Sequence, residues 1–177
     1  MTISLAIDTS TSRTIVGLLD GETILFESFS EGATDHGRAV SDLVVQALMN
    51  NPSPEQVVVG MGPGPFTGLR VGISFARTFA LAREIPVIGV CSVDAIVTGK
   101  NDYTVAIDAR RKEIYWARYE NNVRVEGPSV SKPSEVTDFI IDLYPSARAL
   151  VTLAKTQNES EPFYLRRPDA VPTAERA

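Results

Sequence analysis

The sequence contains one cysteine, Cys91, one histidine, His36, and no long run of apolar residues. A single cysteine excludes an internal disulfide and a zinc site made of several thiolates, which is typical of a reducing compartment. A single histidine argues against catalytic mechanisms that need a histidine base or a pair of histidine metal ligands. A membrane helix needs about 18 consecutive apolar residues, and no signal-peptide pattern follows Met1, so we expect a cytoplasmic protein without a membrane segment.

Basic residues are also few. Lysine and arginine total 17 against 22 aspartates and glutamates, which gives a formal net charge of −5. This balance offers no large cationic surface and argues against autonomous binding of nucleic acid. Hydrophobic residues make up 44% of the 177 residues, enough for a well-buried core, so a mainly disordered chain is excluded.

The first hundred residues alternate between strand and helix patterns. Asp20-Gly21 is a preferred hairpin turn between two β-rich runs, and the three valines at 57–59 indicate a strand buried on both faces. Helical periodicity begins after Thr34 or Asp35, either of which can serve as the N-cap. This alternation is typical of an α/β fold. The predicted strands are 3–7, 14–19, 23–29, 56–60 and 86–90, and the predicted helices are 35–49, 69–83 and a short one at 93–97.

A strand pattern occurs twice. Residues 5–8, Leu-Ala-Ile-Asp, return at residues 105–108 as Val-Ala-Ile-Asp, and a β-rich run and a turn follow in both places. We interpret this as a duplicated strand and hairpin that opens two like-folded halves, although four residues alone leave chance likeness open. The expected division is a complete lobe at 1–100 and a reduced lobe at 101–177, with helices at 135–143 and 147–156 and a frayed tail from about 169.

Each repeated strand ends in an aspartate. Asp8 and Asp108 can each hold a hydrated magnesium ion, and hydroxyls such as that of Ser10 can bind phosphate in a cleft between two halves. The turn after Asp8 has no glycine, however, and serine or threonine after a strand most often closes a turn through local hydrogen bonds. Asp8, Ser10 and Asp108 are therefore weak candidates for cofactor binding, and we predict no cofactor.

A loop rich in glycine and proline, residues 62–68, precedes the second predicted helix. It matches no phosphate-binding motif, and its prolines lack the N–H groups that such a loop uses. Small residues then recur at every fourth position, which permits close approach of another helix. Either this track packs on the 35–49 helix of the same chain, or both helices present a joint surface to a second protein. The small-residue track consists of Gly68, Gly72, Ala76 and Ala80.

The sequence gives little support for a metal site or for a nucleophilic catalytic residue. The residue four places after His36 is a valine, so no second ligand shares its helix face, and one ligand cannot position a catalytic metal. Cys91 as a nucleophile needs His36 as its base, and the sequence has no nucleophile-elbow motif. The basic cluster at 110–112 lies in a β-rich stretch and is typical of a solvated sheet edge. We predict no metal site and no catalytic residue.

Four segments together resemble one bacterial family, TsaB (also called YeaZ). The longest of them is highly specific. The resemblance implies an actin-like ATPase fold of the ribonuclease H-like class, which agrees with the duplicated hairpin. It also implies membership of the complex that installs threonylcarbamoyl on the adenosine beside the anticodon of certain tRNAs. The segments are AIDTS at 6–10, GPGPFTGLRVG at 62–72, DAR with EIY between 108 and 115, and PFYLR at 162–166.

The resemblance further implies a non-catalytic role. The catalytic relative in that complex, TsaD, carries a metal-binding histidine pair, and Ser92 and Ile96 stand at those places here. We therefore expect an inactive paralogue that pairs with and activates TsaD. The implied larger complex contains the P-loop ATPase TsaE and, indirectly, tRNA, and a homodimer is an alternative when the chain is alone. The residues assigned to pairing are His36, Val40, Leu43, Leu69, Gly72, Ile73, Ala76, Phe79 and Ala80.

One departure from the family pattern concerns the second lobe. Compared with TsaB proteins, a segment is missing between residues 143 and 162, which puts any nucleotide contact shared with TsaE in doubt. Two other function classes stay open. An actin-like ATPase or kinase would use Asp8 and Asp108, and a peptidase would need His36 as its base.

Overall fold

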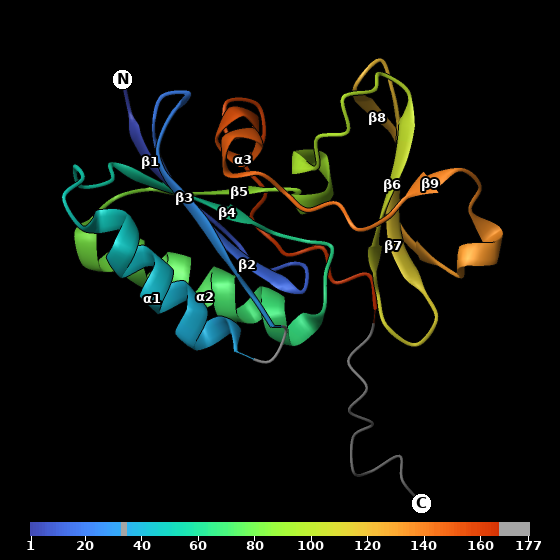
Figure 1. The fold of residues 1–177 in the computed structure, drawn as a ribbon, viewed down its shortest axis with the longest axis horizontal. Helices are drawn as coiled ribbons and strands as arrows, with labels where there is room; N and C mark the ends of the chain where they lie inside the picture. The colour runs from blue at the N-terminus through green and yellow to red at the C-terminus, as the bar shows by residue number, and fades with distance from the viewer. Residues whose placement is uncertain (33–34, 167–177) are drawn as a thin grey trace, which may run out of the picture.

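The computed structural model describes residues 1–32 and 35–166, which form two β-sheets lying side by side (Figure 1). The first sheet has the strand order β3-β2-β1-β4-β5, in which the first three strands are antiparallel and the last two run parallel to the central strand. Its strands are β1 (Ile3–Asp8), β2 (Arg13–Asp20), β3 (Thr23–Glu31), β4 (Gln56–Gly60) and β5 (Val87–Val90).

Helices cover both faces of this sheet (Figure 1). Two helices, α1 (His36–Leu48) and α2 (Phe66–Arg83), lie on one face, and α3 (Ala147–Leu153) lies on the other. Because side chains alternate along a strand, Leu5 and Ile7 of β1 join the core under α1 and α2, whereas Ala6 joins the core under α3. Burial on both faces explains the continuous apolar run of β4. The predicted α/β fold is confirmed.

The second sheet repeats this plan. Its order is β8-β7-β6-β9, so a central strand again has an antiparallel hairpin on one side and a parallel strand on the other. Asp8 pairs with Ile15 and Asp108 with Ile114 at matching ends of the two hairpins. The predicted duplication is therefore confirmed. The strands are β6 (Tyr103–Asp108), β7 (Ile114–Glu120), β8 (Val123–Ser131) and β9 (Phe139–Ile140).

The helix predicted at 135–143 is wrong. A single 3-10 turn, η2 (Pro133–Glu135), is followed by the short strand β9. Positive backbone φ angles at Asp138 and Asp142 interrupt the helix, and the β-branched residues between 136 and 141 favour an extended chain. Pairing of β9 with β6 then satisfies backbone groups that a helix would have left at an open sheet edge.

The other predicted elements are present with shifted ends. Helix α2 begins at Phe66, three residues before the predicted start, and the short helix at 93–97 is the 3-10 turn η1 (Ser92–Ala95). Asp35 occupies the N-cap of α1 without a side-chain capping bond among the described residues. Thr34 and the predicted frayed tail from about 169 lie outside the described residues.

After β9 the chain returns to the first sheet. Helix α3 packs on it, and residues 157–166, which we call the strap, then run past the end of β5. Backbone N–H groups of Glu159 and Phe163 donate to Gly89 and Met61 at 2.8 Å. The division into lobes at residue 100 stays a prediction, since α3 and the strap contact the first sheet. Within the described residues, no helix is both long and apolar enough to span a membrane.

Candidate functional site

Asp8, at the end of β1, is fully buried, and both its carboxylate oxygens accept hydrogen bonds. Oδ1 accepts from the backbone N–H of Ser10 at 2.9 Å and from the Ser10 hydroxyl at 2.6 Å, and Oδ2 accepts from the Ser92 hydroxyl at 2.6 Å. Burial raises the pKa of Asp8, and these hydrogen bonds oppose the shift. The carboxylate is thus occupied by the chain's own donors.

Ser92 connects Asp8 to the glycine–proline loop. Its hydroxyl accepts from the Gly62 backbone N–H at 3.0 Å while it donates to Asp8. The loop lies directly on the turn after β1, because a Cβ at Gly64 would collide with the backbone carbonyl of Ser10. Close packing, rather than phosphate binding, accounts for this glycine. The predicted candidates Asp8 and Ser10 are therefore inside the protein.

Asp108 has a different environment. Its side chain is exposed, and its Oδ1 accepts from the backbone N–H of Arg110 at 2.8 Å, which closes the turn between β6 and β7. Between the two sheets lies a cleft of about 190 Å³, bordered by Thr11, Ser12, Asp108 and Tyr144 among others, but not by Asp8. The structure does not bring the two aspartates together at one accessible site.

The small-residue track of α2 packs inside the chain. A Cβ at Gly68 would contact His36 and the carbonyl of Thr9, and one at Gly72 would collide with the Thr9 hydroxyl. Ala76 and Ala80 are buried as well. Gly68 thus lies against His36 of α1, as one interpretation predicts, whereas Gly72 lies against Thr9 in the turn after β1. Of the residues predicted to pair with a partner, eight are buried and Phe79 is half-buried: His36, Val40, Leu43, Leu69, Gly72, Ile73, Ala76 and Ala80.

The outward faces of the same helices carry apolar side chains. Val45 and Met49, on and just after α1, are 62% and 60% exposed, and Leu81 on α2 is 80% exposed. Phe66 at the start of α2 is 41% exposed and lies against the ring of Tyr164 in the strap. A second protein can reach these residues without unpacking the core.

His36 and Cys91 are engaged separately. His36 Nδ1 lies 2.7 Å from the Thr14 hydroxyl, and burial lowers the pKa of this histidine. Cys91 is fully buried, its sulfur accepts from Arg124 at 2.9 Å, and burial raises the pKa of its thiol to about 12. A thiol held protonated in this way is a poor nucleophile. Within residues 1–32 and 35–166, no three His, Cys, Asp or Glu residues are placed to hold a metal ion.

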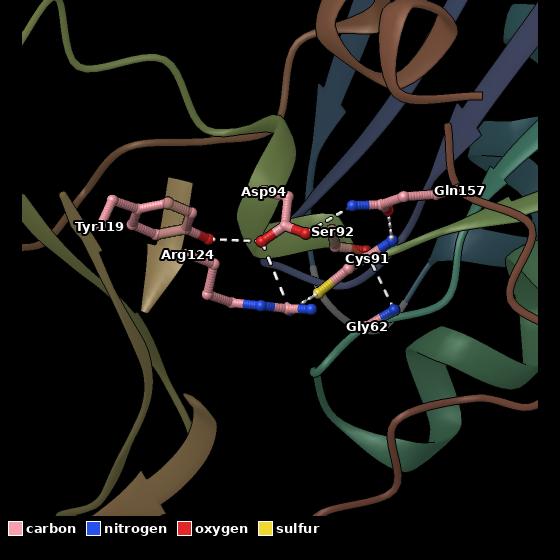
Figure 2. Close-up of polar contacts among 7 residues, drawn as sticks. All are labelled: Gly62, Cys91, Ser92, Asp94, Tyr119, Arg124 and Gln157. Carbon is pink, nitrogen blue, oxygen red and sulfur yellow. Dashed lines mark hydrogen bonds and ion pairs between the residues drawn. The ribbon is translucent and has the colours of Figure 1, made fainter. Parts of the chain in front are cut away.

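A second polar cluster lies where the two sheets meet (Figure 2). Asp94 in η1, whose side chain is 8% exposed, accepts from the Tyr119 hydroxyl at 2.6 Å and from the Gln157 amide at 2.7 Å. Arg124 lies 3.4 Å from the same carboxylate. The Gln157 carbonyl in turn accepts from the Cys91 backbone N–H at 2.9 Å. Burial and the negative charge of Asp94 raise the pKa of Tyr119.

The sequence alone does not identify this cluster of Asp94, Tyr119, Arg124 and Gln157, which we call the Asp94 cluster. Its members come from η1, β7, β8 and the strap, so no local spacing connects them. The one available signal was an acidic residue, Asp94, in the otherwise apolar segment that follows the predicted strand 86–90.

Comparisons with known proteins agree on one family. The family model for TsaD, described as tRNA N6-adenosine threonylcarbamoyltransferase, matches residues 31–171. An uncharacterized protein of Mycobacterium leprae is 39% identical over 204 aligned positions, which cover 97% of this chain and 57% of that protein. The tRNA threonylcarbamoyladenosine biosynthesis protein TsaB of Escherichia coli is 35% identical over 128 positions, which cover 67% of this chain and 55% of that protein.

A solved structure gives the same result for the fold. YeaZ from Pseudomonas aeruginosa superimposes with a TM-score of 0.75 at 24% identity, covering 87% of this chain and 91% of that one. At this identity the likeness shows a shared fold. The chain spans little more than half the length of the two relatives named above.

Proposed function

Because this chain belongs to the TsaB (YeaZ) family and has its actin-like ATPase fold, we propose that it is a non-catalytic subunit in tRNA threonylcarbamoyladenosine biosynthesis. In this role it pairs with a TsaD-type catalytic subunit and holds it in an active conformation. TsaE and tRNA join the pair in a larger complex, in which tRNA is an indirect partner of this chain and does not touch it.

The observation that carries the non-catalytic role is the burial of Asp8. A carboxylate that binds a nucleotide or its magnesium ion must be open to that ligand. Here Ser10 and Ser92 occupy both oxygens of Asp8, and Ser92 stands where the resemblance places a metal-ligating histidine in TsaD. Residues that would be catalytic in a relative thus stabilise the core in this chain.

The pairing surface in this proposal is the outward face of α1 and α2. Val45, Met49 and Leu81 give this face exposed apolar side chains. A stable interface removes about 1,600 Å² of surface from water, and its centre is apolar. The buried residues of the same helices contribute by fixing the shape of this face. Substituting Gly72 or Ala76 would test core packing, so the experiment must use exposed positions.

A charge substitution on the outward face tests the pairing. We expect the wild-type chain to form a heterodimer with a TsaD-type subunit in size-exclusion chromatography with light scattering. Val45→Glu should raise the Kd for the TsaD-type subunit about tenfold or more, because it places a charge in an apolar contact. Val123→Glu is the matched control, because Val123 is equally exposed at 63% but lies on β8. Equal weakening by both variants, or by neither, contradicts the assignment of this face.

The other two function classes receive less support. An ATPase or kinase that uses Asp8 and Asp108 needs both carboxylates open to one ligand, whereas Asp8 is buried. Calorimetric titration with ATP and magnesium would favour this class if it showed tight binding that Asp8→Asn abolished. A peptidase needs a nucleophile and a base that a substrate can reach, whereas His36 and the Thr14 hydroxyl beside it are both buried.

A further inference from the structure

Within the described residues the chain passes between the two sheets three times, and the first two passages meet at η1. The outward passage follows β5 through Cys91 and η1 to β6. The return passage before α3 touches it, since Pro145 forms a bridge with Ile96 and the Ser146 backbone N–H donates to Ala95 at 3.0 Å. If one sheet rotated against the other, the motion would be centred here, because hinges lie where few chain segments connect two packed bodies.

The Asp94 cluster joins both bodies at this point (Figure 2). Tyr119 and Arg124 reach Asp94 from the second sheet, and Gln157 reaches it from the strap, which is bonded to the first sheet. Rotation would separate these donors from a carboxylate that is only 8% exposed. Breaking a largely buried ion pair leaves a charge without compensation, which is more costly than losing a surface pair.

The strap makes a second connection between the sheets. Phe163 packs against the core under α1 and α2 and also against the core of the second sheet. Arg77 of α2 donates to the Ser160 carbonyl at 2.9 Å. At the far end of the strap, Arg166 donates to the Ala109 carbonyl at 3.0 Å and pairs with Glu113, both in the β6–β7 turn.

We infer that the Asp94 cluster and the strap form an intersheet clasp that fixes the angle between the two sheets, so that the cleft between them does not open and close. In two-lobed proteins that bind a nucleotide between their halves, a hinge lets the cleft close on the ligand. A chain that serves another protein by its shape gains from a fixed geometry, because a preorganised surface loses less entropy on binding. The clasp consists of intrachain contacts and does not depend on the pairing proposed above.

Spin-label distance measurement tests the clasp in the full chain. Cysteines replacing Ser53, in the exposed loop before β4, and Val123, on β8, place one label on each sheet. Cys91 stays unlabelled because it is buried and its thiol stays protonated. Dilution with unlabelled chain removes distances between molecules. We expect one narrow distance peak for the otherwise wild-type chain.

Removal of the ion pair should change that distribution. Arg124→Met and Asp94→Asn should each replace the single peak with a broad or divided one, and Tyr119→Phe, the mildest change, should broaden it less. Arg118→Met is the matched control, because Arg118 forms its ion pairs with Glu120 and Glu126 at the surface of the second sheet, away from Asp94. Far-UV circular dichroism identifies any variant that fails to fold, and Tyr119→Phe then decides the question.

Two results would overturn the clasp. One is a single peak of unchanged width in Arg124→Met and Tyr119→Phe, and the other is a divided distribution in the wild-type background. Neither bears on capture of a TsaD-type subunit, which is measured separately with Val45→Glu. The clasp and the proposed function can therefore fail independently.

Discussion

Ser92→Ala is the most direct test of the idea that the Asp8 environment is structural. The Ser92 hydroxyl donates to Asp8 and accepts from the Gly62 backbone N–H, and the residue has no exposed surface. Alanine leaves one buried N–H and one carboxylate oxygen without these partners. Each lost or stranded group costs about 1.5 kcal/mol, so the free energy of unfolding should fall by about 3 kcal/mol.

Ser10→Ala provides the comparison within the same cluster. Its hydroxyl also donates to Asp8 at 2.6 Å, but that oxygen keeps the Ser10 backbone N–H as a second donor. Only one bond is lost, so we expect a cost of about 1.5 kcal/mol. Ser41→Ala, at an exposed serine on α1 that bonds Gly37, should change stability by less than about 0.5 kcal/mol.

Urea and thermal unfolding measure these differences. For a chain of this length 1 kcal/mol corresponds to about 3 °C in Tm, so Ser92→Ala should unfold about 9 °C below the wild type. The order Ser92→Ala, Ser10→Ala, Ser41→Ala, from largest loss to smallest, follows from the number of buried groups left unpaired. If Ser92→Ala costs no more than Ser10→Ala, Ser92 does not bridge Asp8 and the loop.

Three further predictions follow from packing, titration and capping. Gly72→Ala should destabilise by about 2 kcal/mol because its Cβ meets Thr9, whereas Gly37→Ala, into open space on α1, should stabilise by about 0.5 kcal/mol in urea unfolding. Burial lowers the pKa of His36 in the folded state. The free energy of unfolding should therefore be highest above about pH 6.5, the pKa of a free histidine, and should fall as the pH drops through the folded pKa. Melting curves at a series of pH values should show this fall in the wild type and not in His36→Gln. Ser146→Ala removes the N-cap of α3 and should cost about 1 kcal/mol, and an unchanged Tm would contradict the capping contact.

Local patterns predicted most of the secondary structure because each depends on neighbouring residues. The duplicated β1 and β6 hairpins, the α/β order and the burial of β4 follow from alternation, turn residues and a valine run. The 135–143 segment was missed because its strand forms only when β6 lies beside it. No residue within the segment records that distant partner.

For the candidate site, sequence identified the residues but not their exposure. Asp8 and Asp108 end similar strands, yet one is buried under Ser92 and the other faces solvent. The track from Gly68 to Ala80 packs on Thr9 and His36 of the same chain, and a joint surface of α1 and α2 for a second protein stays a prediction.

The sequence by itself determined the two repeated hairpins, the helix positions and the family, because periodicity, turn chemistry and a long specific motif are local properties of a chain. Only the tertiary structure decided that Asp8 is enclosed, that the helix faces named for pairing point inward, and that Asp94 connects the two sheets. Burial and ion pairing depend on which distant segments come together, and residues 94, 119, 124 and 157 meet only after both sheets have formed.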